Sequence, residues 1–172
     1  MHEEIVDSLP STDATYHLAG PVYPPSYLNK LQVKPGWKQV RYLGVIRQNE
    51  VYNLYKNSSV GLVLLGYSPN VGYHKGTLGV LKMFEYMMAG LPVIATDFEL
   101  WKDIIENCNA KCGTCINPYD SSSIAKAINF YLNNPDEAKR HGDNGRKLVK
   151  EKYNWGTQEV NLFKLYSELL GE

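Results

Sequence analysis

The sequence has no excess of charge of either sign, because 18 lysines and arginines balance 18 aspartates and glutamates. A protein that binds nucleic acid or an acidic membrane through electrostatics needs a basic patch or stripe. No such stripe is visible along this chain. We therefore expect no nucleic-acid partner.

Long apolar runs are also lacking. The longest, Val60–Leu65, falls far short of the roughly 20 residues that a membrane-spanning helix needs. At the N-terminus, His2, Glu3 and Glu4 stand where a signal peptide would have basic residues followed by an apolar stretch. The sequence thus predicts a cytoplasmic protein without a transmembrane segment.

Cysteine is scarce, and its three copies, Cys108, Cys112 and Cys115, lie close together. The C-x-x-x-C-x-x-C spacing is that of an iron–sulfur signature in radical enzymes, but such enzymes carry the motif early in the chain. Three thiolates with no nearby histidine would also make an incomplete structural zinc site. We expect reduced thiols around a helix–strand turn and no metal, with metal binding as the alternative.

Strand-like and helical segments alternate along the chain, the pattern of a parallel sheet covered by helices on both faces. The chain has 172 residues, which fits one domain. We predict an α/β, Rossmann-like fold over residues 1–172, with a helix-rich C-terminus and the end of a helix at Met1–Leu9. The predicted strands are Thr15–Ala19, Gln39–Leu43, Val60–Leu65, Pro92–Thr96 and Gly113–Ile116. The predicted helices are Asn49–Asn57, Leu78–Ala89, Leu100–Glu106, Ser123–Leu132, Asp136–Lys152 and Thr157–Leu170.

Ligands of open parallel sheets bind beyond the carboxyl ends of the strands. The loops after Leu43, Leu65 and Thr96 are therefore predicted to share one rim, beside the helix that begins near Leu78. Before the second strand, several prolines predict an irregular segment. They are Pro21, Pro24, Pro25 and Pro35.

The most informative segment is Lys82–Thr96, which reads as a helix that ends at Gly90 and continues through Pro92 into a buried strand. Glu85 lies inside the helix among apolar neighbours, so its carboxylate is expected either to pair with another side chain or to bind a ligand. The preceding loop, Gly76–Gly79, can present backbone N–H groups and the positive end of the helix dipole to an anion. A phosphate site followed by a carboxylate that binds hydroxyls is typical of nucleotide binding.

The K-x-x-E-Y-M-x-A-G-x-P-V-I-A pattern at Lys82–Ala95 resembles the donor-binding segment of the group 1 (family 4) glycosyltransferases of the GT-B fold. Those enzymes build polysaccharides from nucleotide sugars. Tyr42–Ile46 upstream, and Gly113–Asp120 and Tyr153–Trp155 downstream, resemble neighbouring motifs of the same family in the right order. The resemblance covers most of the chain from about Tyr16 onward.

By this resemblance, Glu85 hydrogen-bonds the ribose hydroxyls and Lys82 supplies a positive charge to the diphosphate. The residues alone also allow a Glu85–Lys82 pair within one helix, or two solvated side chains. The phosphate loop consists of Gly76, Thr77, Leu78, Gly79 and Val80. Thr77 stands where many family members have a sugar-binding glutamate, so the resemblance leaves the donor sugar open.

Other rim residues have less specific roles. The resemblance implies that Ile46 and Arg47 frame the base, although Arg47 is equally typical of a surface arginine. His74 and Tyr73 are candidates for contact with the sugar, with a solvated loop histidine as the alternative. Asp97 is predicted to be the N-cap of the following helix.

The resemblance implies the nucleotide-sugar-binding domain of a retaining glycosyltransferase that passes a hexose from a UDP- or GDP-sugar to a cell-surface polysaccharide. No cofactor or metal is expected beyond the substrate, and no catalytic residue is assigned. A family member would also have an N-terminal acceptor-binding domain and one earlier strand. Both are expected to be absent here, and the isolated domain is expected to be inactive. The intact enzyme would be cytoplasmic, and peripheral membrane association is compatible with this.

Two alternatives remain. One is a non-catalytic nucleotide- or partner-binding module, and the other is a sugar-nucleotide epimerase that shares the fold. The last helix, Thr157–Leu170, helps to test the first alternative, because in family members this helix packs against the N-terminal domain. Without that partner it should expose Phe163, Leu165 and Leu169 and promote self-association.

Overall fold

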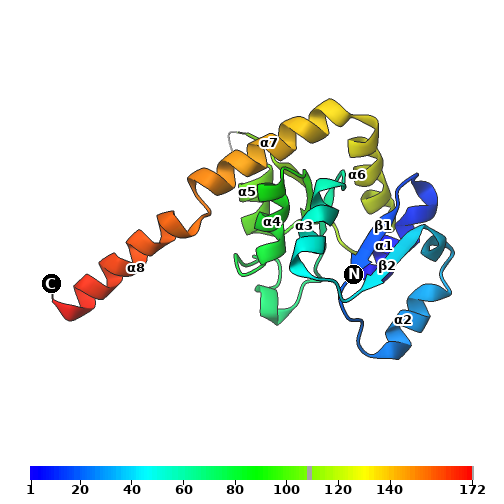
Figure 1. Cartoon of the computed structure of the whole chain (residues 1–172), viewed down its shortest axis with the longest axis horizontal. Coiled ribbons are helices and arrows are strands. Elements are labelled where there is room, and N and C mark those ends of the chain that lie inside the picture. Colours follow the sequence, from blue (N-terminus) through cyan, green and yellow to red (C-terminus); the bar gives the residue numbers. More distant parts are fainter. Residues whose placement is uncertain (108–109, 172) are drawn as a thin grey trace.

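The computed structural model describes residues 1–107 and 110–171 and confirms the predicted α/β class, with parallel strands between helices (Figure 1). The described helices, in chain order, are α1 His2–Ser8, α2 Pro25–Gln32, α3 Gln48–Lys56, α4 Leu81–Ala89, α5 Glu99–Ile105, α6 Ser121–Asn133, α7 Pro135–Glu151 and α8 Trp155–Leu170. Short 3₁₀ helices occur at Leu9–Ser11, Pro35–Gln39 and Pro69–Val71.

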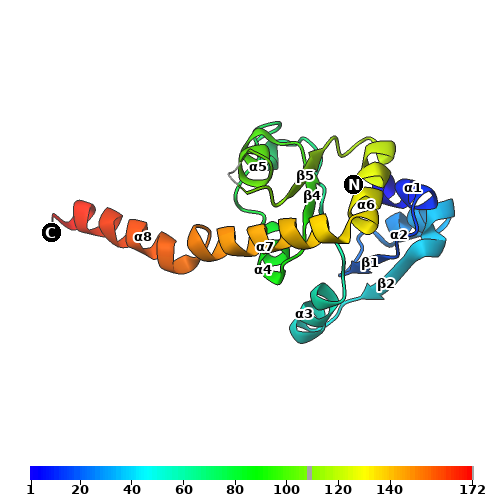
Figure 2. The same ribbon diagram turned by 90° about the horizontal axis from the view of Figure 1, so that it is seen from above.

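The strands of the described residues form two parallel sheets. β1 (Tyr16–Ala19) pairs with β2 (Val40–Gly44), and β4 (Val93–Thr96) lies between β3 (Gly61–Val63) and β5 (Gly113–Ile116). β1 and β3 therefore each pair along one edge only. Figure 2 shows the β1–β2 pair standing apart from β4 and β5.

Alternation along β4 places side chains in two apolar cores. Val93 and Ala95 point into the core formed with α4, α5 and α7, and Ile94 points into the core formed with α1 and α6. All four residues of β4 are buried, as expected for a central strand covered on both faces. Helices on two faces of this sheet therefore fix where its loops emerge.

Several predicted boundaries shift by one or two residues, and two predictions differ from the structure by more than that. The helix expected to begin at Leu78 begins at Leu81, so residues 78–80 belong to the loop before α4. The segment expected to be irregular contains α2, which starts after Pro24 with Pro25 as its first residue. Proline is favoured there because its missing N–H has no partner in the first turn of a helix.

α4 ends as predicted, at Gly90 in the left-handed conformation (φ +81°). The Arg146 side chain of α7 donates hydrogen bonds to the carbonyl oxygens of Met88 (3.1 Å) and Ala89 (2.6 Å). These carbonyls are left without partners by the end of the helix, so Arg146 caps α4 from a neighbouring element. The cap fixes α4 against α7.

α8 projects away from the rest of the molecule in both ribbon views and carries the C-terminus (Figures 1 and 2). None of its residues is buried, and Phe163, Leu165 and Leu169 are exposed as predicted. Within the described ranges, every helix falls short of the length and apolar content needed to cross a membrane.

Candidate functional site

The predicted phosphate loop is held firmly against the fold. The indole Nε1 of Trp101, a buried residue of α5, donates to the carbonyl of Thr77 (2.8 Å), and the Thr77 hydroxyl accepts from the Gly79 N–H (3.2 Å). Gly76 has φ +82°, and a Cβ at this position would lie 2.7 Å from the Cβ of Phe98. Glycine is thus required at position 76 by both backbone conformation and close packing.

The loop leads into a helix N-terminus without a side-chain cap. Val80 is the N-cap residue of α4, and the first turn contains no acidic residue. The first N–H groups of a helix have no partners inside it, and the helix dipole is positive at this end. Leu81, the first residue of α4, is 72% exposed, so this end of the helix is open to solvent. The geometry suits an anion.

Lys82 lies in the first turn of α4 and is half-buried. Burial lowers the pKa of its ammonium group, and the charge of Lys82 in turn contributes to the lowered pKa of His2, which is due mainly to burial. Among the described residues, no carboxylate lies within ion-pair distance of Lys82. A partly desolvated cation without a counter-ion attracts an anionic ligand.

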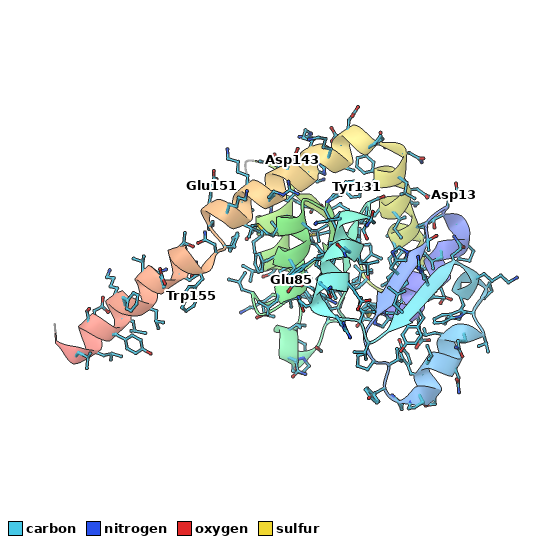
Figure 3. The ribbon with its side chains drawn as sticks, in the orientation of Figure 1. Asp13, Glu85, Tyr131, Asp143, Glu151 and Trp155 are labelled. Atoms are coloured by element: carbon cyan, nitrogen blue, oxygen red, sulfur yellow. The ribbon has the colours of Figure 1, made fainter. Side chains whose placement is uncertain are left out.

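Glu85 lies one turn further along α4 and is exposed (Figure 3). Its partner is Tyr55 of α3, whose hydroxyl donates to Glu85 Oε2 at 2.9 Å. The alternative of a Glu85–Lys82 ion pair is therefore not the one that the structure adopts. Tyr55 was missed in the sequence analysis because nothing in the spacing of α3 indicates a partner on another helix.

The residues predicted to frame the base begin α3. Arg47 is its N-cap residue, and the Arg47 backbone N–H donates to Glu50 Oε2 (2.8 Å), while its side chain is exposed. Ile46 is half-buried. α3 and α4 lie side by side, joined by the Tyr55–Glu85 hydrogen bond. This bond ties the helix that begins after Arg47 to the helix that carries Glu85.

The loop that precedes the predicted phosphate loop is rich in aromatic side chains. The His74 ring lies 4.0 Å from the ring of Tyr67, centre to centre, and Tyr73 has a left-handed backbone (φ +53°). The side chains of His74 and Tyr73 are exposed. Glu99 and Leu100 donate backbone hydrogen bonds to the carbonyls of residues 74 and 75, which anchors the loop on α5.

Asp97 does not cap α5, contrary to prediction. The N-cap is Phe98, and Asp97 Oδ1 instead accepts a hydrogen bond from the Tyr67 hydroxyl. Burial, together with this bond to Asp97, raises the pKa of Tyr67, so the phenol remains a donor. The Lys102 ammonium lies 3.7 Å from Asp97 Oδ2. Asp97 thus holds in place the loop between β3 and the predicted phosphate loop.

The cysteine motif is only partly described. Cys108 lies outside the described residues, Cys112 is buried and Cys115 is half-buried. Burial, followed by the charge of Glu106, raises the pKa of the Cys115 thiol. A thiol that stays protonated is a poor metal ligand. Among the described residues, no group of three histidine, cysteine or acidic side chains is placed to hold a metal ion.

Two surface hollows lie away from the predicted residues. One, of about 400 Å³, lies between β5 and α6, and the other, of about 650 Å³, lies between α6 and the 3₁₀ segment at Leu9–Ser11. No predicted site residue lines either hollow. At the N-terminus of α4, Leu78 and Leu81 are 47% and 72% exposed. Because ligand sites bury most of the ligand surface, a ligand there would need a second surface to close over it.

This chain is similar to known glycosyltransferases. An uncharacterized glycosyltransferase, MJ1607 of Methanocaldococcus jannaschii, is 27% identical over 149 residues, which are 84% of this chain and 35% of the relative. This chain thus spans about a third of the curated relative's length.

Two solved structures share the fold. The C-terminal domain of a group 1 glycosyl transferase, LpcC of Francisella tularensis, has a TM-score of 0.69 and 24% identity, covering 90% of this chain and 80% of that one. Anabaena Alr3699/HepE, solved with UDP and glucose, has a TM-score of 0.75 and 17% identity, covering 96% and 44%.

The family model described as "Glycosyl transferases group 1" matches residues 8–148, which is most of the chain and includes the predicted phosphate loop, α4 and β4. The chain therefore belongs to the group 1 glycosyl transferases.

Proposed function

We propose that this chain is the donor-binding domain of a retaining GT-B glycosyltransferase. It would bind the nucleotide of a UDP- or GDP-sugar, and the intact enzyme would transfer the hexose to a cell-surface polysaccharide. The observation that carries the proposal is the uncapped N-terminus of α4, with Lys82 and Glu85 on its first two turns. Its cytoplasmic location, predicted from the sequence, is part of the same proposal.

The chemistry follows from these groups. The N–H groups of α4 and the Lys82 ammonium would meet the diphosphate, and Glu85 would accept hydrogen bonds from the ribose hydroxyls. Stabilising negative charge on the departing diphosphate is the help that glycosyl transfer most needs from the donor side. Because fixed cations and dipoles supply it, we propose no metal or cofactor requirement.

His74 and Tyr73 remain our candidates for contact with the sugar. Their loop begins at the carboxyl end of β3 and runs into the phosphate loop. The HepE structure, which holds UDP and glucose, supports a nucleotide sugar as the ligand class, although its similarity to this chain is one of fold.

We further propose that the active enzyme needs an acceptor-binding domain and one more strand. Doubly wound sheets commonly have the strand order 3-2-1-4-5-6. The observed orders, β2–β1 and β3–β4–β5, match this order with its central strand left out. A strand between β1 and β3 would pair both of their open edges. The isolated domain is therefore proposed to bind a nucleotide without transferring sugar.

A second candidate function is a non-catalytic module that binds a nucleotide or a protein partner. α8 favours it, because Phe163 and Leu169 are 64% and 72% exposed on a helix that buries no residue. A surface of this kind normally contacts another protein. Sugar transfer by a reconstituted two-domain enzyme would decide between the candidates.

Thermal unfolding of the chain with UDP, GDP, ADP and CMP tests the donor site. A ligand at about one hundred times its Kd adds about 2.7 kcal/mol to the free energy of unfolding. We expect one nucleoside diphosphate to stabilise the chain and the same diphosphate, at the same concentration, to stabilise Glu85→Ala clearly less. If all four ligands leave the unfolding of the wild-type chain unchanged, the proposed donor site is wrong for this chain.

A further inference from the structure

We propose that Tyr55 is a positioning residue of the nucleotide site, which holds one oxygen of Glu85 and leaves the other for the ribose. The inference rests on the proposed function. Its basis is the 2.9 Å hydrogen bond from the Tyr55 hydroxyl to Glu85 Oε2, which joins α3 to α4. Among the described residues, Glu85 Oε1 has no hydrogen-bond partner.

Tyr55 is itself held by a chain of contacts that leads to the sheet. Its ring meets the ring of Tyr86 edge to face, with centroids 5.1 Å apart and an interplanar angle of 87°. Tyr86 lies directly over Gly61 of β3, where a Cβ would come within 2.4 Å of the Tyr86 ring. Glycine at position 61 thus lets Tyr86 pack closely on the strand. Tyr55 is positioned by the core rather than by solvent.

The anchored Tyr55 restricts the conformational freedom of the exposed Glu85 side chain. A free Glu side chain has several rotatable bonds, and ordering it on ligand binding opposes affinity. A carboxylate already held in one orientation avoids most of that loss. A carboxylate also has about four acceptor positions, so the bond from Tyr55 leaves room for both ribose hydroxyls.

The Tyr55 hydroxyl stays a donor at neutral pH. Burial raises its pKa, and so do the hydrogen bond to Glu85 and the negative charge of Glu85. The phenol therefore keeps its proton and remains the donor in the hydrogen bond to Glu85.

The test compares Tyr55→Phe with Tyr52→Phe. Phenylalanine at position 55 keeps the ring contact with Tyr86 and removes only the hydroxyl. Tyr52, on the same helix, is 52% exposed, and its hydroxyl has no hydrogen bond among the described residues. The Kd of each variant is measured by calorimetry for UDP and for 2′,3′-dideoxy-UDP, or for the corresponding GDP pair if the chain prefers guanine.

We expect Tyr55→Phe to weaken binding of the ribonucleotide roughly three- to tenfold, the range for one hydrogen bond to a partly exposed charged group. Binding of the dideoxynucleotide should be unchanged, because that ligand has no hydroxyl for Glu85 to accept. Tyr52→Phe should match the wild type with both ligands. A merely structural role for Tyr55 would weaken both ligands equally.

Three outcomes would overturn the inference. Equal affinity of Tyr55→Phe and the wild type for the ribonucleotide would show that Tyr55 does not position Glu85. Equal losses for both ligands would make its role structural. If the wild-type chain binds neither diphosphate, the proposed donor site itself fails and the role of Tyr55 fails with it.

A second readout needs no nucleotide. Titration of the Tyr55 ring by NMR should give a pKa above the ordinary tyrosine value, and Glu85→Gln should bring it down. A Tyr55 pKa that Glu85→Gln leaves unchanged would show that the hydrogen bond is absent in solution, which would also overturn the inference.

Discussion

Lys82 is a half-buried cation without a counter-ion among the described residues, and an anionic ligand would supply one. Lys82 is half-buried, its charge contributes to the lowered pKa of His2, and it has no carboxylate partner in the described part of the chain. Burying a charge without a partner is unfavourable, and the lowered pKa of Lys82 expresses that penalty. Residues kept in such a state are typical of binding sites rather than of stabilising contacts.

We predict that Lys82→Met weakens UDP or GDP binding about tenfold while leaving the fold intact. Methionine keeps much of the apolar stem and removes the charge, so the free energy of unfolding should stay the same or rise. Calorimetry with the diphosphate and with the free nucleoside separates the effects, since only the diphosphate should lose affinity. Equal losses for both ligands would mean that Lys82 does not meet the phosphates.

His141 predicts how stability depends on pH. It is buried at the contact of α7 with α6, beside the Tyr131 hydroxyl (3.0 Å). Burial lowers its pKa and the Arg140 charge lowers it further, against an opposing effect of Glu137. The unfolded chain, in which histidine has a pKa of about 6.5, thus binds the proton more readily than the folded chain.

The contribution of His141 to the free energy of unfolding should therefore be undiminished above about pH 6.5. The free energy of unfolding should decrease as the pH falls below this value. Urea denaturation at about pH 7.5 and about pH 5.5 measures the decrease. His141→Gln should show a smaller decrease, with the remainder due in part to His2, whose pKa is lowered too. An equal decrease in His141→Gln would contradict the assignment.

At the scale of elements, the contact between α4 and α7 holds the site helix in place. Arg146 caps the end of α4, and α7 approaches it through glycines instead of larger residues. A Cβ on Gly142 would lie 1.9 Å from the carbonyl oxygen of Gly90, and one on Gly145 would lie 3.3 Å from Met87. Small side chains on α7 therefore allow close packing against the end of α4.

We predict that Gly142→Ala lowers the free energy of unfolding by about 3 kcal/mol, because the new methyl group pushes α7 away from α4. In an exposed helix the same change would raise stability by roughly 1 kcal/mol. Lys150→Ala, an exposed position on α7, is the matched control and should change little. Urea denaturation measures the free energy of unfolding. An unchanged or higher value in Gly142→Ala would contradict the close packing of α7 on α4.

Sequence patterns predicted the elements well where a local signal exists. Gly90 and Pro92 marked the end of α4 and the start of β4, and the alternation of strand-like with helical segments located the other strands. Local patterns do not carry contacts between distant elements, so the Tyr55–Glu85 bond and the Tyr67–Asp97 bond were not predicted. The division into two sheets was not predicted for the same reason, because strand pairing depends on partners far away in the chain.

At the scale of the whole molecule, the apolar side of α8 is a conspicuous exposed surface. Trp155, Phe163, Tyr166 and Leu169 recur near helical spacing and are each at least half exposed. A contiguous exposed apolar stripe commonly marks a surface that contacts another protein. In the chain on its own, a second copy offers that surface.

We therefore predict self-association through α8. Sedimentation equilibrium should give a mass that rises with protein concentration for the wild type and stays at the monomer value for a Phe163→Glu, Leu169→Glu double variant. Thermal stability of the dilute variant should match the wild type, because α8 buries no residue. A wild type that stays monomeric at all concentrations would refute this prediction.

The central claim is that the N-terminus of α4, with Lys82 and Glu85, binds a nucleoside diphosphate. Calorimetric titration of the chain with UDP and GDP tests it most directly, beside Glu85→Ala and a Glu151→Ala control on α7 away from Glu85 (Figure 3). We predict one diphosphate bound per chain, with affinity unchanged in Glu151→Ala and at least tenfold weaker in Glu85→Ala. No binding, or equal binding by Glu85→Ala and the wild type, would contradict the claim.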